Sequence, residues 1–132
     1  MLTRRAFGAC ALCSAIGLAA GAAEAEQPAG FTRTILRRTE FPGDRYVTLL
    51  VRVEIAPNAL IARHTHPGVE TSYILDGEGV LTVQGQPDQT MKTGDGFQVP
   101  AGVPHSLQNG AATTRVVATY VVEKDKPLAS PA

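Results

Sequence analysis

The chain has 132 residues, of which 18% are charged, and its 12 basic and 12 acidic residues give a formal net charge of zero at pH 7. This length suits one domain with one hydrophobic core and leaves no room for a second. The charge balance, with no run of basic residues longer than two, argues against nucleic acid or an anionic membrane as a main partner.

The first 25 residues have the pattern of an export signal. The pair Arg4-Arg5 precedes an uncharged stretch rich in Ala and Gly over residues 6–23, and small residues follow around Ala25. This is similar to a twin-arginine signal peptide, so we expect residues 1–25 to be removed and the mature protein to be periplasmic or secreted. A cut two or three residues earlier and a retained anchor are the alternatives. The stretch is only weakly apolar, whereas stable membrane insertion needs about 20 strongly apolar residues.

Both cysteines, Cys10 and Cys13, fall within this expected signal. We therefore expect the mature domain to have neither a disulfide framework nor a cysteine-rich zinc site. Any metal ion would be held by imidazole and carboxylate groups.

Turn-forming residues recur at short intervals from Phe41 onward and leave no space for a long helix. Between the turns, residues 47–55 alternate between apolar and polar, which is typical of a strand with one buried face. Residues 80–83 read similarly, and residues 116–122 are apolar on both faces, as in a strand covered on both sides. Short strands at this spacing predict an all-β sandwich or jelly roll.

All three histidines lie in two short segments. His64 and His66 are two residues apart, so on a strand their side chains point to the same side. Pro67-Gly68 then interrupts the strand, which allows Glu70 to turn back towards them. His105 follows a turn whose backbone is fixed by prolines. Each histidine alone would also fit a solvated strand or loop, but together with the carboxylate they predict a metal site.

The same residues match the two sequence motifs of the cupin family, which this chain resembles. The first motif is met by His64, His66, Glu70 and Gly77, and the second by Gly94, Pro100, Gly102, His105 and Asn109. Asn58 stands where the first motif has a glycine. Asn tolerates a left-handed backbone conformation better than most residues, so we expect the turn to survive.

The resemblance implies a fold and an assembly. The fold is a small double-stranded β-helix, the jelly-roll cupin barrel, over residues 32–124, and we expect residues 125–132 to form a loose C-terminal tail. Single-domain cupins often dimerise, which implies a homodimer in which the strand over residues 32–38 pairs with a neighbouring subunit.

The resemblance also implies one divalent transition metal ion, Fe, Mn, Ni, Cu or Zn, held by His64, His66, Glu70 and His105. Four protein ligands leave two positions on a six-coordinate ion, which suits Lewis-acid or oxygen chemistry, whereas zinc could be closed off as a structural site. With a redox-active ion, the resemblance implies a quercetinase-like dioxygenase that acts on a small oxygen-chelating molecule. A non-catalytic module that binds a small ligand and a metal-dependent lyase or isomerase are the alternatives. Glu70 is also a possible base.

Strand alternation suggests which further residues surround the site. Residues that share the parity of Glu70 or His105 are candidates for lining the cavity: Ser72, Ile74, Leu107 and Asn109. Asn109 would also fit a cap on the following turn. Tyr73 has the opposite parity and is expected on the outer face, while Tyr120 is left undecided.

Overall fold

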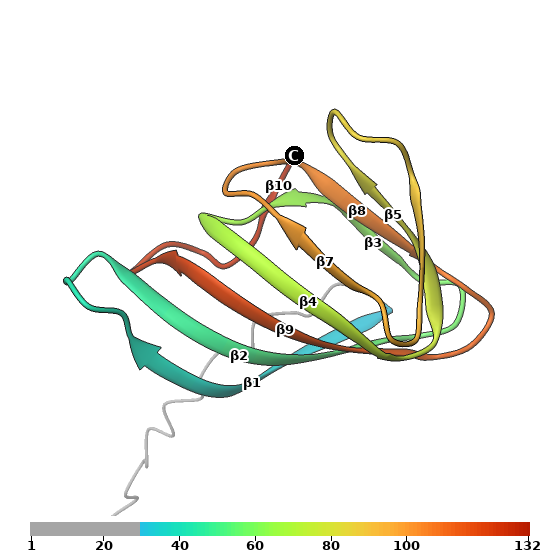
Figure 1. Ribbon diagram of the computed structural model, residues 1–132, viewed down its shortest axis with the longest axis horizontal. Coiled ribbons are helices and arrows are strands. Elements are labelled where there is room, and N and C mark those ends of the chain that lie inside the picture. The colour runs from blue at the N-terminus through green and yellow to red at the C-terminus, as the bar shows by residue number, and fades with distance from the viewer. Residues whose placement is uncertain (1–29) are drawn as a thin grey trace, which may run out of the picture.

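Two antiparallel five-stranded sheets face each other in this protein (Figure 1). The computed structural model describes residues 30–132, so the expected signal peptide and both cysteines lie outside the described residues. The strands are β1 (Phe31–Glu40), β2 (Tyr46–Ile55), β3 (Leu60–Thr65), β4 (Gly68–Asp76), β5 (Glu78–Val83), β6 (Gln89–Lys92), β7 (Gly96–Val99), β8 (His105–Asn109), β9 (Thr114–Glu123) and β10 (Ser130–Pro131).

The strand order is β1-β2-β9-β4-β7 in one sheet and β10-β3-β8-β5-β6 in the other. Neighbours in each sheet are mostly far apart in sequence, as expected when a chain winds back and forth between two sheets of a jelly roll. The all-β jelly-roll prediction is confirmed. Within residues 30–132, no helix is long and apolar enough to span a membrane.

The hydrophobic core lies between the two sheets and follows the predicted alternation. In β2, every odd-numbered residue from Val47 to Ile55 is buried. In β9, the even-numbered residues from Thr114 to Val122 are buried, while Val117 and Val121 are half-buried on the outer face. That outer face is therefore less covered than the apolar sequence of β9 suggested.

Two turn positions show how local sequence sets the ends of the strands. Asn58 adopts a left-handed backbone conformation with φ of 58°, as expected for a residue in place of glycine. Gly68 is needed for a different reason from the one the sequence indicated. Its backbone is not left-handed, but a Cβ there would collide with the backbone of Val121 and Val122 on the adjacent strand β9.

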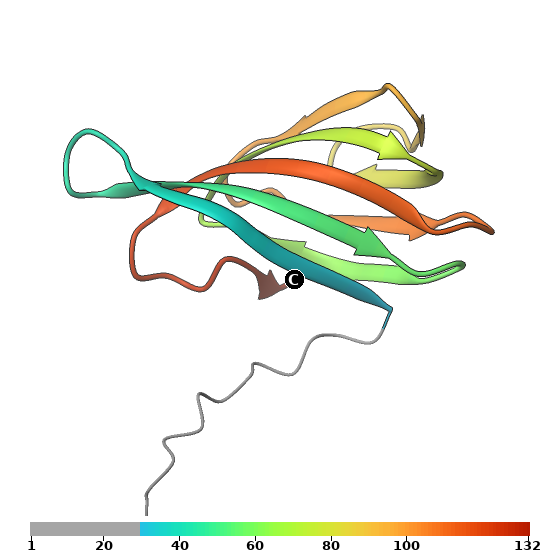
Figure 2. The ribbon, with the colours of Figure 1, turned by 90° about the horizontal axis from the view of Figure 1, so that it is seen from below.

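The prediction of a loose C-terminal tail is wrong. Residues 130–131 form β10, which pairs with β3 opposite Thr65 and His64, and Leu128 packs against the core. Figure 2 shows this segment turning back from the end of β9. The sequence signal was weak because one apolar side chain and a two-residue strand give no measurable periodicity.

The N-terminal strand extends slightly beyond the predicted range and pairs with β2 of its own chain, from Phe31 opposite Ile55 to Glu40 opposite Val47. It forms one edge of its sheet, so its other side has no strand neighbour among the described residues. Pairing with another subunit would therefore have to use that outer edge.

Candidate metal centre

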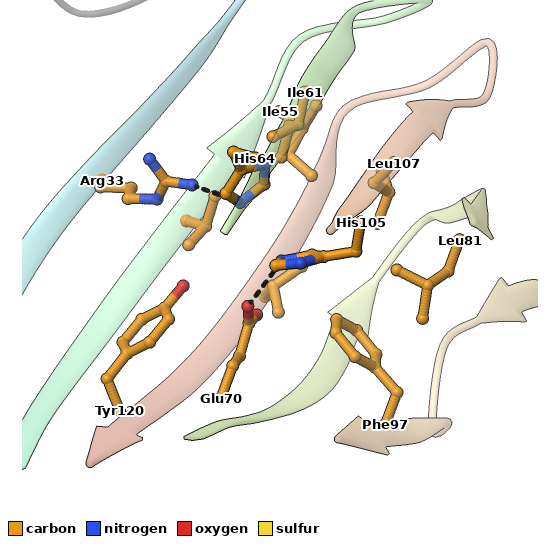
Figure 3. Close-up of a pocket in the computed structure, with 12 residues that line it drawn as sticks. Arg33, Ile55, Ile61, His64, Glu70, Leu81, Phe97, His105, Leu107 and Tyr120 are labelled. Carbon is orange, nitrogen blue, oxygen red and sulfur yellow. Dashed lines mark hydrogen bonds and ion pairs between the residues drawn. The ribbon is translucent and has the colours of Figure 1, made fainter. Parts of the chain in front are cut away.

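The structure brings together all four predicted site residues. His64 lies near the end of β3, directly opposite His105 on β8, while Glu70 points inward from β4. His66 lies in the short connection between β3 and β4. All four side chains are buried, and the three histidines can each direct a nitrogen to within 4.8 Å of the others. The close-up in Figure 3 shows His64, Glu70 and His105 around the cavity.

The outer nitrogen of each imidazole contacts a backbone carbonyl. The Nδ1 atoms of His64, His66 and His105 lie 2.7, 2.6 and 2.9 Å from the carbonyl oxygens of Ala62, Leu128 and Val103, respectively. A carbonyl oxygen only accepts hydrogen bonds, so each Nδ1 carries the proton and donates it. In the neutral ring, Nε2 therefore has a free lone pair. The fold selects one tautomer for all three rings.

These lone pairs converge with the carboxylate on one small volume. His66 Nε2 lies 3.2 Å from His64 Nε2 and 3.0 Å from Glu70 Oε2. His105 Nε2 is buried 3.3 Å from Glu70 Oε2 and makes no hydrogen bond of acceptable geometry among the described residues. Acceptors facing acceptors repel one another unless a proton or a cation lies between them.

A divalent transition metal ion fits this arrangement. With metal–ligand distances of about 2.1 Å, neighbouring ligand atoms are separated by roughly 3.0 Å at right angles and roughly 3.4 Å at tetrahedral angles. The separations of 3.0 to 3.3 Å fall in this range. Each imidazole is also oriented by the hydrogen bond from its Nδ1 atom to a backbone carbonyl. Histidines that bind metals are usually supported in this way. The three buried histidines could form a metal site.

The protonation of the cluster favours ligand binding. Burial lowers the pKa of His64 from 6.5 to about 4, so this ring is neutral at neutral pH. Burial alone would raise the pKa of Glu70, but the nearby His105 and His66 rings and the hydrogen bond from Ser72 outweigh it and hold that pKa well below its usual range. Ser72 Oγ donates to Glu70 Oε1 at 2.6 Å, which orients the carboxylate. A carboxylate with a lowered pKa is a better ligand than base.

A cavity of about 30 Å³ adjoins the cluster, roughly twice the 10–15 Å³ that one water molecule requires. It is bounded by side chains from both sheets, mostly apolar: Arg33, Val53, Ile55, Ile61, His64, Glu70, Leu81, Phe97, His105, Leu107, Val116 and Tyr120. Figure 3 shows the Tyr120 hydroxyl and the Arg33 guanidinium turned towards the histidines. Burial and the nearby Glu70 carboxylate raise the pKa of Tyr120, so its hydroxyl keeps its proton.

The residues proposed from strand parity have different roles. Leu107 lines the cavity and Ser72 contacts Glu70, whereas Ile74 belongs to the core and is not part of the cavity wall. Asn109 is structural: its amide group donates to three backbone carbonyls, and its Oδ1 accepts a hydrogen bond from Thr114. Tyr73 is half-exposed on the outer face, as expected.

Sequence reasoning missed Arg33 and Phe97 and did not assign Tyr120 to the cavity. Arg33 shares strand parity with the buried Phe31, and this was the available signal. A charged residue near a strand end normally lies at the surface, so parity alone does not predict a place for Arg33 in the cavity wall.

Comparisons with known proteins find likenesses in sequence and in fold. The chain is similar in sequence to the HTH-type transcriptional regulator PuuR of Escherichia coli K12, with 36% identity over 59 residues. The matched segment covers 44% of this chain and 31% of the regulator. Among solved structures, the DMSP lyase DddQ of Ruegeria pomeroyi superposes with a TM-score of 0.64 at 21% identity, over 78% of this chain and 52% of that one. The polyketide cyclase RemF of Streptomyces resistomycificus gives a TM-score of 0.59 at 26% identity, over 74% and 69% of the two chains.

The chain spans about a third of the curated regulator and about half of the lyase. The likeness to the lyase, at 21% identity, concerns the fold alone. Residues 51–122, which contain all four residues of the cluster, match the family Cupin_2, described as a cupin domain. This match extends over more than half of the chain, and the protein belongs to the cupin family.

Proposed function

We propose that this cupin is a metal-dependent oxidoreductase of the dioxygenase type that acts on a small organic molecule with chelating oxygens. The ligands are His64, His66, Glu70 and His105, and the convergence of their Nε2 and carboxylate oxygen atoms on one point is the observation that carries the proposal. When bound, a redox-active divalent ion would supply open positions for dioxygen and for substrate oxygens.

The remaining residues of the site control access and protonation. Phe97, Leu81 and Leu107 give the cavity an apolar wall that excludes water. The protonated hydroxyl of Tyr120 can donate a hydrogen bond to an oxygen of the substrate, since its pKa is raised. The cavity volume of about 30 Å³ favours a small substrate over a flavonol unless side chains move.

Non-redox chemistry is the second candidate, and Tyr120 favours it. A protonated hydroxyl beside a ligand cluster could serve as the acid in a lyase or isomerase that uses the ion only as a Lewis acid. DddQ, which shares the fold, is described as a lyase. A non-catalytic module that senses a small ligand is a third possibility, because PuuR, which matches part of this chain, is a regulator.

Elemental analysis of protein purified without affinity metals tests the proposal first, with His105→Ala as the disrupted variant and Tyr73→Phe on the outer face as the control. Near one equivalent of a redox-active ion, lost in His105→Ala and kept in Tyr73→Phe, supports the oxidoreductase. Oxygen uptake with enediols should then be detectable. Stoichiometric zinc would instead favour Lewis-acid or structural use, and an absence of metal in all three proteins contradicts the proposal.

We also propose that the protein is exported through the twin-arginine route and cleaved after Ala25. The Arg4-Arg5 pair and the weakly apolar stretch that follows it support this. The mass of the protein recovered from the periplasm or medium tests it, because an uncut chain would be heavier by the mass of residues 1–25.

A homodimer is proposed as the assembly. Large apolar side chains are exposed on the outer face and edge of the sheet that contains β1, including Ile35, Leu50, Val69, Tyr73 and Leu75. Their burial against a second copy would remove an apolar surface from water. Sedimentation at micromolar concentration that shows only monomer would refute the dimer.

A further inference from the structure

The two oxygens of the Glu70 carboxylate have different partners. Oε2 lies 3.0 Å from His66 Nε2 and 3.3 Å from His105 Nε2, so it faces the converging lone pairs of the cluster (Figure 3). Oε1 instead accepts a hydrogen bond from Ser72 Oγ at 2.6 Å. One oxygen is therefore directed at the candidate metal position, while the other is held by a hydroxyl.

Strand geometry and burial keep the Ser72 hydroxyl on this oxygen. Glu70 and Ser72 are two residues apart on β4, so both side chains point to the inner side of the sheet, and both are buried. The residues that pair with Ser72 on the neighbouring strands are Ala118 on β9 and Phe97 on β7. Their side chains contain no hydrogen-bond acceptor. The hydroxyl therefore has no competing acceptor on these two side chains, and water has little access to it.

The number of carboxylate oxygens that bind the ion determines how much room a substrate has. A carboxylate binds a metal ion through one oxygen or through both. With one oxygen, Glu70 and the three histidines leave two positions on a six-coordinate ion, whereas with both oxygens they leave a single position. A substrate that chelates the ion through two oxygens needs two open positions. The partner of Oε1 is therefore decisive for the proposed chemistry.

We propose that Ser72 is a positioning residue that keeps Glu70 a one-oxygen ligand and thereby keeps two positions of the bound ion open. This inference rests on the proposed function, since it requires an ion held by the four residues. For Oε1 to reach the ion, the carboxylate would have to turn and give up its short hydrogen bond, which would leave the buried hydroxyl without its acceptor. Without the hydroxyl, nothing on β4 opposes binding through both oxygens.

Two probes that need different numbers of positions test this proposal on the cobalt-loaded full chain. Azide binds a metal ion through one nitrogen, and acetohydroxamate binds through two oxygens. The wild type should bind both, as followed by the visible spectrum of the cobalt ion. Ser72→Ala should bind acetohydroxamate about tenfold more weakly or worse, as expected for loss of a hydrogen bond to a charged group, and should keep its affinity for azide.

Thr71→Ala is the matched control, because it removes a hydroxyl from the next residue of the same strand. The Thr71 side chain is exposed on the outer face, where its hydroxyl accepts a hydrogen bond from Gln98. This variant should bind both probes like the wild type. Ser72→Thr retains the hydroxyl and should keep most of the affinity for acetohydroxamate. All four proteins should hold one equivalent of cobalt and be folded by circular dichroism.

Three results would overturn the assignment of Ser72 and leave the proposed function intact. Equal weakening of both probes in Ser72→Ala would indicate a general disturbance of the site, and loss of the ion would show that the hydroxyl supports metal binding itself. Unchanged affinity for acetohydroxamate would show that another neighbour of Glu70, such as Tyr120 on β9, suffices to hold the carboxylate. A wild type that holds no ion, or whose ion binds neither probe, would overturn the proposed function as well.

Discussion

Removal of residues 127–132 should weaken metal binding even though none of these residues is a candidate ligand. The carbonyl of Leu128 accepts the Nδ1 proton of His66 at 2.6 Å and thereby keeps its Nε2 available for an ion. Loss of such a bond to a ligating histidine reduces metal affinity by about 10- to 100-fold, which corresponds to about 1.4 to 2.7 kcal/mol. The freed ring could also rotate or take the other tautomer.

Leu128→Ala separates this effect from packing. It removes the side chain that packs against the core but keeps the carbonyl that accepts from His66. Competition with a chromophoric chelator gives the zinc affinity of each protein, and circular dichroism confirms that each is folded at the assay temperature. The truncated chain should bind zinc at least tenfold more weakly than Leu128→Ala. Equal affinities in these two variants would show that the carbonyl does not support the site.

Three further predictions concern the stability of the metal-free protein. The pKa of His64 is lowered from 6.5 to about 4, so protonation favours the unfolded chain, and stability present above pH 6.5 should be lost as the pH falls towards 4. The full shift corresponds to about 3.4 kcal/mol, and solvent screening of this partly buried ring reduces the expected loss to about 2 kcal/mol. Urea unfolding at both pH values measures this loss, and a His64→Gln variant that keeps the same pH slope contradicts it. Gly68→Ala should lower the free energy of unfolding in urea by about 1–3 kcal/mol, because the new Cβ would collide with the backbone of Val121. Gly96→Ala is the control and should cost less, since the nearest atom to its Cβ lies at 3.5 Å, and equal losses in the two variants would refute the close-approach argument. Asn109→Ala should lower the free energy of unfolding by about 2–4 kcal/mol, because it leaves buried backbone carbonyls without their hydrogen-bond donor. The metal affinity of the folded variant should equal that of the wild type, and a changed affinity would show that Asn109 contributes to the metal site.

The fold was predictable because its signals are local and repeated. The alternation in β2 and the frequent turn residues specify short strands with one buried face, and Asn58 takes the left-handed conformation that its place in the motif requires. The C-terminal segment was not predictable in the same way. Its position depends on the Leu128 carbonyl, which accepts a hydrogen bond from His66, and on the pairing of a two-residue strand with β3. Both are backbone interactions, which the identity of the side chains does not reveal.

The candidate site was predictable to the extent that it depends on spacing along one strand or around one turn. His64 and His66 satisfy that condition, and Glu70 and His105 follow tight turns. Arg33 on β1 and Tyr120 on β9 belong to the same sheet as Glu70 on β4, and they reach the cavity only because β1 pairs with β2, β2 with β9 and β9 with β4. Residues of this kind approach one another through tertiary structure alone, so their spacing along the chain carries no signal of the site.

The three Nδ1 hydrogen bonds have a further consequence for how the site takes up an ion. Because all three carbonyls fix the proton on the outer nitrogen, any proton held inside the cluster must be an additional one, shared for example between His66 Nε2 and Glu70 Oε2 at 3.0 Å. Such a proton relieves the repulsion between acceptors in the metal-free protein, and a metal ion would have to displace it. Metal uptake should therefore release about one proton and weaken as the pH falls. Unbuffered titration with zinc measures this release, and uptake without protons would mean that the converging lone pairs are stabilised by other means.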